Sequence, residues 1–289
     1  MTADRSPAVH TVLGPVPPER LGTTNSHDHL FLRSALLPGQ ELDDPAAAED
    51  ELRAFAALGG GAVVQWTPYG LGRRIDDLVE LAETTGLHLV AATGLHQAAH
   101  YDDPDALRRL DPAALFTAEL HDRAGLIKVA GGYHGLDAHA RWTMTAAAEA
   151  HHATGAPIAV HHELGTGAQD VLELLCDRLG VPPHRVLLGH LNRFPDLGLH
   201  RELAASGAYL AFDGPSRANH ATDHRLLDCL HALADAGHAH RLLLGGDTTT
   251  AAARGNPGMP YLLHRLRPRL GPELAALVLT DNPAAAFAW

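Results

Sequence analysis

The sequence predicts a (β/α)8 TIM barrel, an α/β fold formed by all 289 residues as one domain. Three observations predict it: short apolar runs alternate with longer amphipathic segments, the runs suit buried strands, and there are eight of them. The expected strands are Thr24 to Leu30, Gly61 to Thr67, Leu87 to Thr93, Leu126 to Ala130, Pro157 to His161, Arg185 to His190, Ala208 to Phe212 and Arg241 to Asp247.

The amphipathic segments between these runs are expected to form the helices around the barrel. They are Asp44 to Leu58, Arg73 to Thr85, Pro104 to Arg123, Thr143 to Thr154, Ala168 to Leu179, Leu197 to Ser206 and Thr222 to Ala236. A glycine, which favours the left-handed conformation that ends a helix, follows six of them: Gly59, Gly86, Gly155, Gly180, Gly207 and Gly237. We expect a short N-terminal extension before the first strand. Met259 to Trp289, in which Asp281-Asn282-Pro283 starts a last short helix, is expected to form a C-terminal helical tail.

The charge and composition of the chain exclude some classes of partner. The formal net charge is -12 and the isoelectric point is near 5.9, so we expect no nucleic-acid partner and no membrane partner. The N-terminus lacks the apolar core of a secretory signal, and no apolar run approaches the ~20 residues of a spanning helix. The two cysteines, on separate helical patterns, are expected to be packed thiols. We therefore expect a cytoplasmic protein that acts on a small molecule, with the oligomeric state open and a homodimer as one candidate.

Lys128 is the only lysine among the 22 Lys and Arg residues of the chain. It lies within the apolar run Leu126 to Ala130, where burial of an ammonium group is costly. Unlike a guanidinium, a buried ammonium can lose its proton and leave a nucleophilic amine. Such an amine can form a Schiff base, act as a base, or add carbon dioxide to become a carbamate that bridges two metal ions. The alternative is a lysine at a strand end whose ammonium reaches solvent.

Ligand-type residues stand where five of the eight predicted strands end, which in this fold is where chemistry collects. They are His27 and His29 on the first strand, Lys128 on the fourth, His161 on the fifth, His190 on the sixth and Asp247 on the eighth. Side chains at alternate positions of a strand face the same way, so His27 and His29 can share one ion. Of His161 and His162 only one can face inward, and we choose His161 because it ends the apolar run.

The number of donors predicts two divalent ions. His27, His29 and Asp247 suit one ion, His161 and His190 suit a second, and a carbamate on Lys128 would bridge them. Imidazole and carboxylate ligands favour Zn²⁺, with Mn²⁺ or Co²⁺ as alternatives, and leave positions open for water as a catalytic site requires.

These residues, in this order, carry a resemblance to the phosphotriesterase family of the amidohydrolase superfamily. The resemblance extends over essentially the whole chain, through the segments Thr11 to Pro15, Gly70 to Arg73, Val90 to Gly94 and Asp281 to Ala284. It implies a binuclear centre in which His27, His29 and Asp247 bind the more buried ion and His161 and His190 bind the other. Carboxylated Lys128 and a hydroxide would bridge the two ions, and Asp247 would carry the proton in a hydrolysis at a carbonyl or phosphoryl centre.

Polar loops after the strands predict the class of substrate. Arg217 and Arg254 follow the last two strands and would suit an anionic group, while Tyr133 and His134 follow the fourth. These loop patterns are similar to those of the branch of the family that hydrolyses sugar lactones, including phosphorylated ones. We therefore predict a metal-dependent lactonase. The alternatives are a phosphotriesterase, an amidohydrolase acting on a C–N bond and, least favoured, a catalytically silent binding protein.

Overall fold

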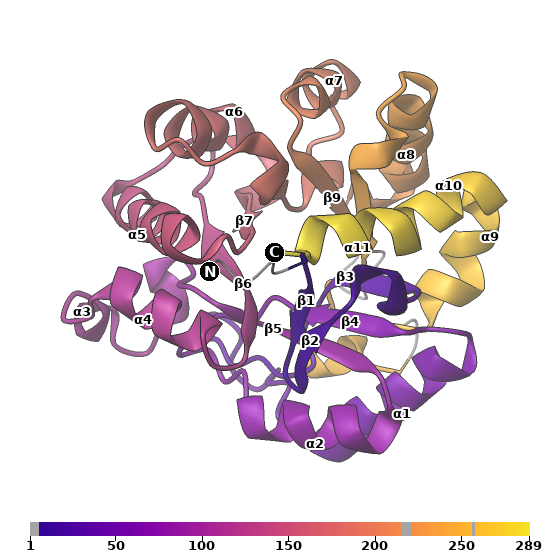
Figure 1. Ribbon diagram of the computed structural model, residues 1–289, viewed down its shortest axis with the longest axis horizontal. Helices are drawn as coiled ribbons and strands as arrows, with labels where there is room; N and C mark the ends of the chain where they lie inside the picture. Colours follow the sequence, from indigo (N-terminus) through magenta and orange to yellow (C-terminus); the bar gives the residue numbers. More distant parts are fainter. Residues whose placement is uncertain (1–5, 215–220, 256–257) are drawn as a thin grey trace.

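Eight parallel strands surround a central axis, which confirms the predicted barrel (Figure 1). The computed structural model describes residues 6–214, 221–255 and 258–289. The strands pair in chain order and are β3 (Thr24–Asp28), β4 (Ala62–Gln65), β5 (His88–Thr93), β6 (Ala124–Ala130), β7 (Ile158–His161), β8 (Val186–Leu188), β9 (Tyr209–Asp213) and β10 (Leu242–Gly245). Several are shorter than predicted. The sixth predicted strand, for example, ends two residues before His190, whose φ of 63° is incompatible with extended backbone.

The first and last barrel strands meet through two hydrogen bonds at their carboxyl ends. The amides of Gly246 and Asp247 donate to the carbonyl of His27 at 2.9 and 3.0 Å. The approach requires a glycine, because a Cβ at Gly245 would lie 2.5 Å from that carbonyl oxygen. The barrel is thus nearly closed, and Asp247 is held beside His27.

Helices cover the outside of the strands (Figure 1). They are α1 (Pro45–Ala57), α2 (Ile75–Thr85), α3 (Pro104–Leu107), α4 (Pro112–Leu120), α5 (Ala138–Thr154), α6 (Ala168–Leu172), α7 (Leu197–Ala205), α8 (Leu226–Asp235), α9 (Arg267–Leu270) and α10 (Pro272–Ala276). The six glycines predicted to follow helices all have positive φ. One core fills the space between strands and helices, and a second, which includes Val64, Trp66 and Leu187, fills the barrel interior.

The bounds of two helix predictions were wrong for reasons that helix caps explain. The predicted helix Pro104 to Arg123 is two helices, because Asp111 caps a new one through the amide of Ala114 and Pro112 has no N–H to continue the first. The helix predicted from Thr143 starts five residues earlier, at Ala138, where Asp137 accepts a hydrogen bond from Ala140 N at 2.7 Å.

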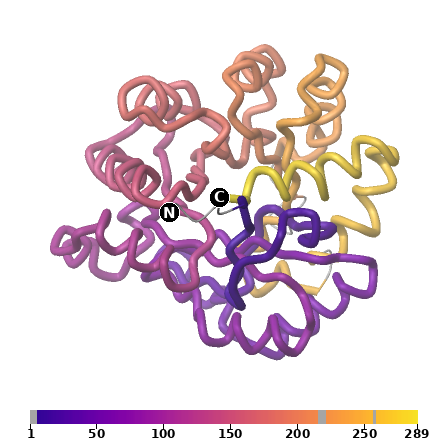
Figure 2. The backbone as a smooth tube through the Cα atoms, in the orientation of Figure 1, coloured from indigo at the N-terminus to yellow at the C-terminus, as the bar shows by residue number. Residues whose placement is uncertain are grey.

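The two ends of the chain close the amino end of the barrel (Figure 2). The hairpin of β1 (Val9–Thr11) and β2 (Gly14–Val16) lies beside α11 (Asn282–Phe287), the predicted last helix. Val9 bridges to Ala288, and the Trp289 indole donates to the carbonyl of Gly125 near the start of β6. The opposite end, where the strands terminate, is left to hold the site.

None of the helices in the described ranges is long and apolar enough to cross a membrane. Cys176 and Cys229 are free thiols, as predicted.

Candidate metal centre

A cavity of about 280 Å³ lies at the carboxyl ends of the strands. All six predicted ligands line it: His27, His29, Lys128, His161, His190 and Asp247. His96, His100 and Arg193 also line it, together with apolar side chains that include Leu32, Pro68 and Leu71. The strand ends therefore bring together the residues that the sequence singled out.

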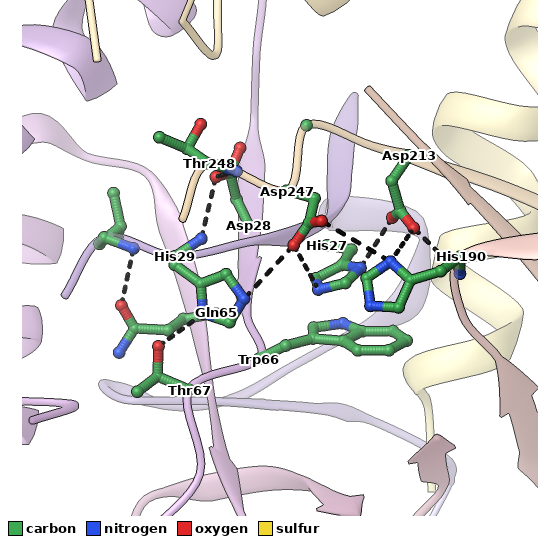
Figure 3. Close-up of polar contacts among 12 residues, drawn as sticks. His27, Asp28, His29, Gln65, Trp66, Thr67, His190, Asp213, Asp247 and Thr248 are labelled. Carbon is green, nitrogen blue, oxygen red and sulfur yellow. Dashed lines mark hydrogen bonds and ion pairs between the residues drawn. The ribbon is translucent and has the colours of Figure 1, made fainter. Parts of the chain in front are cut away.

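His27, His29 and Asp247 form the first group of donors (Figure 3). The Oδ1 atom of Asp247 lies 3.4 Å from His27 Nε2 and 3.5 Å from His29 Nε2. All three side chains are buried, and burial lowers the pKa of His29. Two imidazoles and one carboxylate in this arrangement are a donor set that zinc and similar divalent ions prefer.

Hydrogen bonds at the Nδ1 atoms of His27 and His29 direct the Nε2 lone pairs of both rings toward Asp247. The Thr67 hydroxyl donates to the carbonyl of Phe31 at 2.6 Å, so its oxygen must accept the Nδ1–H of His29 at 2.7 Å. His27 donates its Nδ1–H to Asp213 Oδ1 at 2.7 Å and stacks on Trp66, with ring centroids 3.8 Å apart (Figure 3). Such outer contacts set the tautomer and orientation of metal-binding histidines.

His161 and His190 form the second pair of donors, with ring centroids 4.5 Å apart. His161 Nε2 lies 3.2 Å from Glu163 Oε2, and a proton donated there leaves the Nδ1 lone pair free. Burial lowers the pKa of His161 to about 4, and this hydrogen bond lowers the pKa of Glu163 to about 2. The Nδ1 atom of His162 lies 3.0 Å from the carbonyl oxygen of Thr166. His162 is not among the described residues that line the cavity.

The buried imidazole of His190 is not satisfied by the described protein groups. Its Nδ1 lies 2.7 Å from Asp213 Oδ2 without the alignment of a hydrogen bond, and the atom has no hydrogen-bond partner among the described residues. His27, His190 and Asp213 form a second group of three donors close enough to hold an ion. This group shares His27 with the first, and together the two His/Asp groups indicate a binuclear metal site, which the residues present fit.

Lys128 lies on β6, next to β7, and lines the cavity together with both pairs of histidines. Its side chain is 2% exposed, and burial lowers the pKa of its ammonium to about 7. Burial therefore favours the neutral amine, which is the form that adds carbon dioxide. Gly94, directly after β5, permits the backbone there to lie against the backbone of Lys128, because a Cβ at Gly94 would lie 2.0 Å from the carbonyl oxygen of Lys128.

Asp247 also contacts Arg193, which donates from its guanidinium to Oδ2 of the carboxylate. Burial alone would raise the pKa of Asp247, but His190, Arg193 and His27 together hold it well below its usual range. The carboxylate is therefore ionised and available as a ligand. Its backbone has a φ of 53°, a sparsely populated conformation for a residue other than glycine.

The placement of Arg254 argues against the substrate contact predicted for it. Its guanidinium donates to the carbonyls of Leu30 and His29 and lies 3.5 Å from Glu51 Oε2, with the side chain 10% exposed. It does not line the cavity among the described residues. The loop position was correct, but the side chain turns inward to bind main-chain oxygens.

The other predicted substrate residues lie at the rim or outside the described residues. Tyr133 is 63% exposed and its ring is 4.2 Å from that of His134. His134 lines a separate pocket beside Phe194. Their roles in substrate binding stay predictions, and so does that of Arg217, which lies outside the residues that the structure describes.

Sequence reasoning missed several residues of the site. Asp213 ends an apolar run as the ligands do, so the same rule could have found it. Arg193 and His96 follow strands at the correct end of the barrel, but a lone arginine or histidine in a loop carries no specific signal. Thr67 was counted as an ordinary strand residue.

The fold and the site define a metal-dependent hydrolase of the barrel type. A sequence profile of the Phosphotriesterase family matches residues 7–285, and the chain belongs to this family. A phospho-furanose lactonase of Mycoplasmopsis agalactiae is 31% identical over 248 residues, which cover 76% of this chain and 70% of the relative. The expectation of an enzyme is confirmed.

Solved structures agree with this assignment. A lactonase from Listeria monocytogenes superposes with a TM-score of 0.89 at 26% identity, covering 97% of this chain and 98% of that one. A mutant of the organophosphorus hydrolase from Deinococcus radiodurans gives a TM-score of 0.84 at 27% identity, with 97% of each chain covered.

Proposed function

We propose that this protein is a binuclear metal-dependent lactonase that acts on a polar or phosphorylated sugar lactone. The observation that carries the proposal is that four histidines, one aspartate and Lys128 line one small cavity: His27, His29, His161, His190, Asp247 and Lys128. Relatives named phospho-furanose lactonase support the choice of a lactone.

In this proposal His27, His29 and Asp247 hold one ion and His161 and His190 hold the other, with a carbamate of Lys128 between them. When bound, the two ions would supply Lewis-acid polarisation of a carbonyl oxygen and activation of a water molecule. Asp247 is the carboxylate that lines the cavity among the described residues, and it lies 3.4 Å from His27 Nε2 and 3.6 Å from His190 Nδ1. It would accept the proton released during hydrolysis.

The cavity favours a small substrate with a polar or anionic part. Its volume of about 280 Å³ lies near the lower end of the range for ligand pockets. Arg193 is the arginine that lines it among the described residues, and a guanidinium can bind a phosphate or carboxylate through paired hydrogen bonds. Arg193 therefore replaces Arg254 as the residue we assign to an anionic substituent. A cytoplasmic location, a homodimer and the identity of the metal, Zn²⁺ before Mn²⁺ or Co²⁺, stay predictions.

A substrate comparison tests the proposal. Protein freed of metal with a chelator is reloaded with Zn²⁺, Mn²⁺ or Co²⁺, and kcat/KM is measured for sugar γ-lactones with and without a phosphate group, a neutral aryl phosphotriester and a small N-acetyl amide. The lactones should give the highest kcat/KM, with the phosphorylated lactone ahead. A higher value for the phosphotriester or the amide would contradict the proposal.

A further inference from the structure

His96 lies in the cavity wall but differs from the predicted ligands in the way its ring is bound. It follows β5, is 7% exposed, and lines the cavity beside His161 and His100. Its ring centroid is 4.7 Å from that of His161 and 4.1 Å from that of His100. The side chain is thus close to the reacting centre, yet none of the roles described above uses it.

The hydrogen bond to its ring fixes the tautomer of His96. The backbone amide of Gln97 donates to His96 Nδ1 at 2.8 Å. A backbone N–H can only donate, so Nδ1 must be the nitrogen that carries the lone pair. A neutral imidazole has one ring proton, and in His96 that proton is therefore on Nε2.

This arrangement is the reverse of that in the ligand histidines. His29 and His161 give their N–H to protein acceptors, Thr67 and Glu163, and keep a lone pair for an ion. His96 gives its lone pair to a protein donor and keeps an N–H for the cavity. It is therefore unsuited to bind a metal ion and suited to donate a hydrogen bond.

The surroundings of His96 hold this donor in place. Its backbone amide donates to the Tyr101 hydroxyl at 2.9 Å, and its carbonyl accepts from His139 Nε2 at 2.8 Å. The side chain of Gln97 is itself anchored to the carbonyl of Gly131 at 2.7 Å. A donor that is already held in position needs little reorientation when negative charge develops next to it, so little free energy is spent on that reorientation.

We propose that the Nε2–H of His96 donates a hydrogen bond to the acyl oxygen of the substrate and stabilises the negative charge that this oxygen gains during attack on the carbonyl carbon. The inference rests on the proposed function and adds a catalytic residue to it. No proton moves in this step, so His96 is neutral before and after it. His100, whose Nδ1 lies 2.9 Å from the Ser34 hydroxyl, packs beside the ring and is not assigned a part in it.

A set of three variants separates the donor from the shape of the side chain. In His96→Gln the amide nitrogen reaches the place of Nε2, in His96→Asn it reaches only the place of Nδ1, and His96→Phe keeps a ring without a donor. We expect kcat to fall about 100-fold or more in the Asn and Phe variants, the usual loss for one such donor, and to recover in part in the Gln variant. Metal content should be unchanged in all three.

Two measurements do not depend on turnover. Nitrogen NMR of the imidazole side chains in the metal-free protein, assigned by loss of a signal in His96→Phe, should show His96 protonated on Nε2. Calorimetry with the metal-loaded protein should show that a cyclic phosphonate, which resembles the transition state, binds the Asn variant at least tenfold more weakly than wild type.

Protonation on Nδ1, a Gln variant no better than Phe, or full phosphonate affinity in the Asn variant would overturn the inference. Failure of the proposed function is a separate result, namely a wild-type preference for a phosphotriester or an amide. In that case kcat of the same variants is compared on the preferred substrate. The same loss and partial recovery are expected, because His96 would then donate to the polarised oxygen of that substrate.

Discussion

Arg193 and Asp247 form an ion pair inside the cavity, and the two oxygens of the Asp247 carboxylate contact different partners. The guanidinium binds Oδ2, while Oδ1 lies within 3.5 Å of the Nε2 atoms of His27 and His29. The arginine therefore holds the carboxylate so that Oδ1 stays directed at the two imidazoles. It also places a positive charge in the cavity wall, where the proposed anionic substituent would bind.

We expect Arg193→Ala to lower kcat/KM about tenfold to 100-fold, because a hydrogen bond to a charged group contributes roughly 1.5 to 3 kcal/mol. The loss should be larger for a phosphorylated lactone than for its neutral analogue, and Arg193→Lys should restore part of the difference. Steady-state kinetics on the two lactones measure this. Equal losses on both would show that Arg193 only positions Asp247.

Lys128→Ala should lose most activity and part of the bound metal, because the bridging carbamate cannot form. Added acetate or another short carboxylate should restore part of both by occupying the bridge. Lys128→Arg is the matched control, since it keeps the charge but cannot be carboxylated, and it should be as inactive as the Ala variant without rescue. Full activity of either variant with two ions bound would refute a bridging role.

Thr67→Val should weaken binding of the first ion, because it removes the acceptor for the Nδ1–H of His29 while keeping the shape of the side chain. Loss of such an outer contact typically lowers metal affinity 10- to 100-fold. Competition with a coloured chelator measures the affinity. Thr67→Ser keeps the hydroxyl and should bind metal as wild type does; if the Val variant did the same, the hydroxyl would not orient His29.

Arg254→Ala should lower the melting temperature and reduce kcat/KM equally for anionic and neutral lactones. The guanidinium binds the carbonyls of Leu30 and His29 and pairs with buried Glu51, so its loss leaves a buried carboxylate without its ion-pair partner. Thermal unfolding and kinetics on both lactones test this. A loss confined to the anionic lactone would instead support the contact between Arg254 and the substrate that the sequence predicted.

The barrel, and the gathering of the six predicted ligands in one cavity, could be predicted because each depends on local pattern. Lys128 stands out by residue type and by its apolar surroundings, and alternation along the first strand places His27 and His29 on one face. The direction of a loop side chain depends instead on contacts between distant segments. Arg254 turns inward because Glu51 on α1 and the end of β3 offer acceptors, which no local pattern reveals.

The same reason explains why His96 and Arg193 were not predicted as site residues. The role of His96 depends on a hydrogen bond from Gln97, whose side chain is in turn anchored to Gly131 at the end of β6. Asp213 is an intermediate case, since it ends β9 as the ligands end theirs, but its contacts to His27 and His190 appear only when the barrel closes.

The number of divalent ions that activate each chain tests the binuclear centre most directly. Metal-free protein is titrated with Zn²⁺ in bicarbonate buffer while bound metal and lactone hydrolysis are followed together. The account predicts that binding and activity both level off at two ions per chain in the wild type, and that Lys128→Ala does not reach this plateau. Full activity at one ion per chain, or an unchanged plateau in Lys128→Ala, would contradict it.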